Sequence, residues 1–161
     1  MARHKENRID VVNVRLVKEP SIYAADPIKT PEDVLSAVAN ELKQYDREVF
    51  AIINLKTSGQ IINLNICSVG TLNSSLISPR EVFKSSILSN AAAFIAVHNH
   101  PSGNCHPSEE DKKTTERLMK CGEILDIRML DHIIVAGETG EMLSMKKEGM
   151  MPDLHRRERE R

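Results

Sequence analysis

Residues 98 to 111, HNHPSGNCHPSEED, place three histidines, two serines and three carboxylates directly after the uncharged run AAAFIAV. An uncharged apolar run of this kind is typical of a strand covered on both faces. His98 and His100 lie where this strand ends, and residues i and i+2 of a strand point to the same face. Both imidazoles are therefore expected to converge on one point, and imidazole is a common metal ligand.

A carboxylate follows at Asp111, in the first turn of a helix that we expect Ser108 to cap, after a Pro-x-Gly turn. Two imidazoles and one carboxylate with a fourth position open form a catalytic zinc set rather than a closed structural one. The open position can hold a water molecule, whose pKa zinc lowers from about 15.7 towards 7. We predict one zinc ion per chain, bound by His98, His100 and Asp111.

Each of these side chains also has an ordinary structural explanation. Ser108 and Asp111 make a sound capping box without any metal, and the joint placement of all the residues is what favours a metal site. Cys105 and His106 lie in the same loop and could reach the zinc, but the three-ligand set is complete without them. His132 opens another buried run, where we expect a core histidine or one that supports a ligand.

Helices and strands that could position these residues alternate along the chain. Thr30, Ser78 and Ser108 are each followed three residues later by an acid, which predicts three capped helix starts. Strand-like segments lie at 49–55, 61–67, 92–97 and 132–137. An early edge strand is expected at 11–17, and a tight hairpin at 137–143. The segment 61–67 alternates apolar and asparagine residues, so one face of it should be wetter. The order predicts an α/β sandwich with a central mixed sheet.

Composition limits the class of protein. A chain of 161 residues with 40% hydrophobic residues and a net charge of −1 is expected to form one domain, without a global attraction to nucleic acid. We expect a tail over 1–11, the domain over 12–150 and a charged tail over 151–161. Three scattered cysteines, with no signal segment and no long apolar run, predict a cytoplasmic protein without disulfides or a membrane span.

The segment 98–111 resembles the JAMM (MPN+) metalloprotease motif, H-x-H-P followed by S-x-x-D. Its surroundings, SPREVFKSSILSNAAAFIAVHNHPSG and LDHIIVAG, are similar to the RadC-like branch of that superfamily. The resemblance runs from about residue 12 to residue 150. It implies the JAMM α-β-α sandwich, which is related to cytidine deaminases. It also implies a zinc-dependent peptidase or isopeptidase.

The resemblance assigns roles to individual residues. His98, His100 and Asp111 match the metal ligands, and Ser108 matches the serine that steadies the oxyanion. The family also uses a distant glutamate as general acid/base, and DREVFAIINL nominates Glu48. Glu81, in PREVF, is the rival, although its expected position in a capping box already explains it.

Other functions stay open. The letters HNH suggest a nuclease, but HNH nucleases disperse these residues over a larger unit. Deaminase chemistry lacks its H-x-E and P-C-x-x-C elements here. A zinc-binding module that recruits partners without cleaving, or a DNA-associated repair or mobile-element protein, remains an alternative. Full-length RadC proteins carry an N-terminal helix-hairpin-helix segment that residues before 12 do not provide. We therefore expect a peptide or isopeptide-linked partner and no specific nucleic-acid binding.

Overall fold

A mixed sheet forms the centre of the computed structural model, which describes residues 9–22, 29–70 and 77–156. Its strands are β1 (Val49–Leu55), β2 (Ile61–Val69), β3 (Ala93–His100), β4 (Arg128–Ala136) and β5 (Met142–Ser144). They lie in the order β2-β1-β3-β4-β5. β3 and β4 are parallel, and the other neighbouring strands are antiparallel. The predicted mixed sheet is confirmed.

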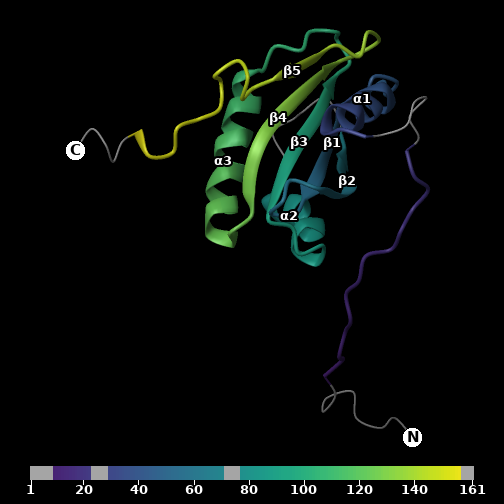
Figure 1. Cartoon of the computed structure of the whole chain (residues 1–161), viewed down its shortest axis with the longest axis vertical. Helices are drawn as coiled ribbons and strands as arrows, with labels where there is room; N and C mark the ends of the chain where they lie inside the picture. Colours follow the sequence, from purple (N-terminus) through teal and green to yellow (C-terminus); the bar gives the residue numbers. More distant parts are fainter. Residues whose placement is uncertain (1–8, 23–28, 71–76, 157–161) are drawn as a thin grey trace, which may run out of the picture.

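Helices cover both faces of the sheet (Figure 1). α1 (Pro31–Leu42) packs on one face, where its apolar side chains meet Val49, Ile53 and Val97. α2 (Pro79–Leu88) and α3 (Glu109–Leu125) pack on the other face, around Phe50 and Phe94. This is the expected α-β-α sandwich, with a separate apolar core on each side of the sheet. No helix in the described part of the chain has the length and apolar character that a bilayer crossing requires.

The predicted helix starts are present, and two of the three use the expected caps. Thr30 and Ser108 each accept a hydrogen bond from the amide three residues on, and the carboxylate at that position accepts one from the backbone N–H of the cap residue. α2 also begins directly after its predicted cap, Ser78, but that side chain makes no capping bond. The acid there, Glu81, instead pairs with Lys84 at 3.0 Å. The capping box expected at Ser78 is therefore wrong.

The strand predictions hold within the sheet and fail before it. β1 begins and ends as predicted, and β3 continues through His100. Residues 11–17, expected to form an edge strand, have no regular structure and run away from the sheet (Figure 1). A strand needs a neighbour for its backbone hydrogen bonds, and residues 9–22 lie beside none. High β-propensity in this segment is therefore not sufficient to form a strand.

The polar face of β2 is turned towards α2 rather than to water. Asn63 donates to Ser89 at 2.8 Å and accepts from the buried amide of Asn54 at 2.7 Å. The Asn54 amide oxygen also accepts from Ser86 at 2.6 Å. The expectation that this face would be the wetter one is corrected, because hydroxyls of α2 supply the partners that water would otherwise provide.

The parallel pair β3–β4 ends beside the loop that follows His100. In the register His100 lies opposite Ala136, and the next residue, Gly137, donates its N–H to the His100 carbonyl at 2.8 Å. A Cβ added at Gly137 would lie 2.9 Å from that carbonyl oxygen and 2.8 Å from the Pro101 carbonyl oxygen. Only glycine permits the two backbones to approach this closely.

We predict that Gly137→Ala lowers the free energy of unfolding by about 1–3 kcal/mol, because the new methyl group meets backbone that cannot turn aside. Urea denaturation of the metal-free protein measures this change. Glu141→Ala, an exposed change in the same hairpin, is the control and should alter stability by no more than about 0.5 kcal/mol. Unchanged stability of the Gly137 variant would show that the backbone at His100 and Pro101 moves aside for the methyl group at little cost, contrary to the prediction.

Candidate metal centre

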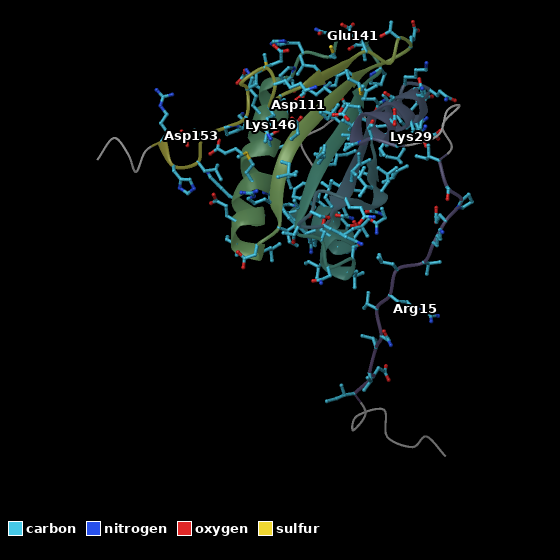
Figure 2. The ribbon with its side chains drawn as sticks, viewed as in Figure 1. Arg15, Lys29, Asp111, Glu141, Lys146 and Asp153 are labelled. Carbon is cyan, nitrogen blue, oxygen red and sulfur yellow. The ribbon has the colours of Figure 1, made fainter. Side chains whose placement is uncertain are left out.

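His98, His100 and Asp111 meet where β3 stops and α3 begins. Asp111, which is labelled in Figure 2, lies in the first turn of α3. The two Nε2 atoms of the histidines lie 2.9 Å apart. The Asp111 carboxylate approaches His98 Nε2 at 3.2 Å through Oδ1 and His100 Nε2 at 3.1 Å through Oδ2. Among the described residues, these are the three metal-ligating side chains that form such a group. The structure thus brings together all three residues that the sequence predicts as ligands.

The group is largely shielded from water, with side-chain exposures of 5% for His98, 11% for His100 and 6% for Asp111. Burial opposes the charge on Asp111, but hydrogen bonds from His100 and His98 outweigh it and hold the pKa of this carboxyl well below its usual value. Burial likewise opposes a charge on His100, yet the hydrogen bond to Asp111 and the Asn104 carbonyl raise the pKa of this imidazole. Asp111 is therefore an anion that attracts a cation into the group.

The neighbour of His100 determines which of its nitrogens carries the hydrogen. His100 Nδ1 lies 2.6 Å from the backbone carbonyl of Asn104, and a carbonyl can only accept. Nδ1 of the neutral ring therefore carries the hydrogen, which leaves the lone pair of Nε2 directed at the other two ligands.

A chain of buried hydrogen bonds does the same for His98. Thr115 donates its hydroxyl to the Asp111 carbonyl at 2.7 Å, so its oxygen can accept from His132 Nδ1 at 2.6 Å. Burial, with the nearby His98, lowers the pKa of His132 well below its usual value, so this ring stays neutral. Its Nε2 then accepts from His98 Nδ1 at 2.7 Å. The lone pair of His98 Nε2 is thereby left for the centre of the group.

The residues present fit a zinc ion. When both rings are neutral and carry their hydrogens on Nδ1, two nitrogens and a carboxylate face one another as acceptors, and a metal ion can take the place of the protons that otherwise bridge them. Ligand atoms bound tetrahedrally at zinc–nitrogen lengths of about 2.0–2.1 Å lie roughly 3.3 Å apart, close to the separations seen here. Two imidazoles and one carboxylate also match the ligand set of catalytic zinc sites, which keep a fourth position open.

The other two predicted site residues lie at the edge of this group. Glu48 directly precedes β1, whose Phe50 pairs with His98, and its charge contributes to the raised pKa of His100. Ser108 is the N-cap of α3, and its backbone N–H donates to Asp111 Oδ2 at 2.8 Å. Its hydroxyl oxygen accepts from the Asp111 amide at 3.1 Å, and the side chain is exposed.

The remaining candidates are not part of the group. Glu81 pairs with Lys84, and its charge acts on Cys67, whose pKa is raised to about 12, chiefly by burial. Cys105 and His106 are on the loop between β3 and α3 but do not join the three clustered ligands. His132, expected either in the core or beside a ligand, is fully buried and contacts His98.

Sequence reasoning missed three supporting residues: Thr115, Asn104 and Asn99. Thr115 follows Asp111 by four positions, a spacing that places both on one face of a helix and could have identified it. Asn104 acts through its backbone carbonyl, so its side-chain type carries no signal. Asn99 lies between the two histidines and bonds to the backbone near Glu48, a contact that only the folded sheet reveals.

A family model described as the RadC-like JAB domain matches residues 28–150. The chain belongs to the RadC-like JAB domain family. The match covers β1–β5, the helices α1–α3 of the described residues, and His98, His100 and Asp111. The predicted resemblance is confirmed, and the fold described above is the one that this JAB family member adopts.

Bacterial relatives support the same assignment. The chain is 45% identical to a UPF0758 protein of Desulforudis audaxviator over 123 residues. This stretch makes up 76% of this chain and 53% of the relative. It is 44% identical over 124 residues to a UPF0758 protein of Moorella thermoacetica, a stretch that makes up 77% of this chain and 53% of that relative. It is 39% identical over 124 residues to a UPF0758 protein of Bacillus pumilus, a stretch that makes up 77% of this chain and 54% of that relative. The chain spans about half the length of these relatives, whose names state no activity.

We predict that His100→Ala reduces the zinc content of purified, zinc-loaded protein from one ion per chain to well below one. The variant leaves one imidazole and one carboxylate, too few ligands for a stable zinc site. Elemental analysis after dialysis measures the content. His106→Ala removes an exposed histidine of the same loop and should retain the ion. Equal zinc content in wild type and His100→Ala would refute the ligand assignment.

Proposed function

We propose that this JAB domain is a zinc-dependent hydrolase of amide bonds, acting on a peptide or an isopeptide-linked protein. The observation that carries the proposal is the convergence of His98, His100 and Asp111 as buried acceptors with Glu48 acting electrostatically on the same group. His98, His100 and Asp111 would hold one zinc ion per chain. A peptidase site needs a Lewis acid, a base and an oxyanion donor, and this chain offers candidates for all three.

Zinc, when bound, supplies Lewis acidity that lowers the pKa of a water molecule towards 7 and polarises a carbonyl group. Glu48 is the general base: its carboxylate takes a proton from the attacking water as the new carbon–oxygen bond forms. The same carboxyl then delivers this proton to the nitrogen of the departing amine as the amide bond breaks. Glu48 suits this role because it directly precedes β1, whose Phe50 pairs with His98, and it is not one of the three clustered residues.

Ser108 is the oxyanion donor. Its oxygen accepts a hydrogen bond from the Asp111 amide, which leaves the hydroxyl hydrogen to donate to the substrate carbonyl oxygen as that oxygen becomes negative. A single well-placed donor of this kind contributes about 3 kcal/mol to catalysis. The backbone N–H of Ser108 also donates to the Asp111 carboxylate, so the proposed oxyanion donor is bonded directly to a candidate metal ligand.

A parallel screen of the zinc-loaded protein tests the reaction class. The substrates are a library of internally quenched peptides, lysine-linked isopeptides of matched sequence, and duplex DNA. We expect cleavage of a peptide or isopeptide and no binding of duplex DNA with submicromolar affinity at about 0.15 M salt, where such binding needs clustered phosphate contacts. Cleavage of DNA alone would support a nuclease instead. Zinc binding with no cleavage in any arm would support a partner-recruiting module.

We predict that Glu48→Gln lowers turnover of the cleaved substrate by about 10²–10⁴-fold, the usual contribution of a general acid–base group. Glutamine keeps the shape of the side chain but cannot accept the proton of the water. Zinc content and thermal stability should barely change, because a proton shuttle is not a ligand. Steady-state kinetics, elemental analysis and thermal unfolding measure the three quantities.

Glu81→Gln is the matched control, since it makes the same chemical change at the start of α2. It removes an exposed ion pair with Lys84 and should leave turnover nearly intact. At most it weakens the helix start by around 1 kcal/mol. If Glu48→Gln cleaves at the wild-type rate, the base lies elsewhere and the mechanism is wrong.

A further inference from the structure

Asn99 separates the two histidine ligands in β3 and points away from them, because side chains alternate across a strand. The residue is completely buried. Its amide oxygen accepts from the Val49 N–H at 2.7 Å, and its amide nitrogen donates to the Arg47 carbonyl at 3.0 Å. Both partners belong to the backbone, and they are the residues immediately before and after Glu48.

The side chain of Asn99 takes the place of a backbone ladder at this point. The register of β1 and β3 ends with the pair Phe50 and His98, and beyond it the amide of Asn99 supplies the hydrogen bonds to β1. From the other side, Gly70 donates its N–H to the Glu48 carbonyl at 2.8 Å. The backbone at residues 47 and 49 is thus bonded to the Asn99 side chain, and the Glu48 carbonyl is bonded to Gly70, so the chain around Glu48 is held from β3 and from the residue that follows β2.

We infer that Asn99 is a positioning residue that fixes Glu48 relative to the metal-binding group. The inference rests on the proposed function, in which Glu48 moves the proton. An asparagine amide carries an acceptor and a donor in one planar group, which is what a bond to an N–H and a bond to a carbonyl together require. Because Asn99 lies between His98 and His100, the same strand that presents the ligands also sets the place of the base. A displacement of about 1 Å in such a site can lower the rate about 10²-fold.

Asn54 provides a control at the opposite end of β1. It is completely buried too, and its amide also donates and accepts hydrogen bonds, to Asn63 and from Ser86. Replacing either asparagine by leucine removes a buried amide group from the same sheet and leaves a side chain of similar size in its place. Only the change at Asn99 releases the backbone on both sides of Glu48.

The test compares Asn99→Leu with Asn54→Leu in the full chain loaded with zinc. We expect crystal structures to show the Glu48 backbone displaced by about 0.5 Å or more in Asn99→Leu, a shift that matters in a site of this kind, and unmoved in Asn54→Leu. The Val49 amide should exchange its hydrogen faster only in the Asn99 variant, while both variants keep their zinc. Where Asn99→Leu does not fold, Asn99→Asp keeps the acceptor for Val49 and replaces the bond to Arg47 by a carboxylate oxygen that faces the Arg47 carbonyl and should displace it. An unmoved Glu48 with an unchanged Val49 amide would overturn the inference.

Kinetics on the peptide or isopeptide found by the screen separate positioning from general stability. We expect Asn99→Leu to lower kcat by about 10–100-fold with little change in KM, whereas Asn54→Leu lowers stability and leaves kcat within about twofold. In a Glu48→Gln background, Asn99→Leu should have almost no further effect, because it acts through the carboxylate that is already lost. Additive effects would overturn the inference. If Glu48→Gln alone does not slow turnover, the proposed mechanism fails, while the position of Glu48 in the crystal structures still decides the role of Asn99.

Discussion

Three acceptor atoms that face one another in a buried place are the constraint on which the rest of this structure depends. Nε2 of His98, Nε2 of His100 and the Asp111 carboxylate lie about 3 Å apart, and a shared cation satisfies them. The sheet topology brings them together. α3 returns the chain between the parallel strands β3 and β4, so its first turn lies at the end of β3. Because β1 is antiparallel to β3, the start of β1 arrives at the same end with Glu48.

The buried polar network keeps the hydrogen of His98 on Nδ1, which leaves the lone pair of its Nε2 for the centre of the group. Thr115 lies one helical turn after Asp111, so α3 supplies both a ligand and the hydroxyl that begins the chain through His132 to His98. The last acceptor of the network is the backbone carbonyl of Asp111, which accepts from the Thr115 hydroxyl. No described buried side-chain nitrogen or oxygen lacks a hydrogen-bond partner. A fully satisfied network of this kind specifies one arrangement, whereas a half-satisfied one would cost more than an apolar core.

Local chemistry explains how much of this could be predicted from sequence. β1 and the caps at Thr30 and Ser108 were predictable because apolar runs and capping boxes act over a few residues. The meeting of His98 with His100 was predictable because strand alternation turns both side chains to one face. The strand expected at 11–17 failed, since pairing depends on a neighbour and not on the segment itself. Asn99 was missed for the same reason: its partners, Arg47 and Val49, are distant along the chain.

The two histidines, His98 and His100, are separated by one residue, Asn99, for a physical reason that the motif alone does not reveal. A strand offers alternate residues to opposite faces, so His98 and His100 can serve the metal while Asn99 serves the backbone of β1. A slip of one residue in the β1–β3 register would turn the ligands to the α1 face and Asn99 to the metal-binding face. The ladder from Phe50 to Leu55 and the packing of both apolar cores oppose that slip. Correct pairing of β1 with β3 is therefore the condition under which the candidate ligands and the proposed base, Glu48, can occupy one site.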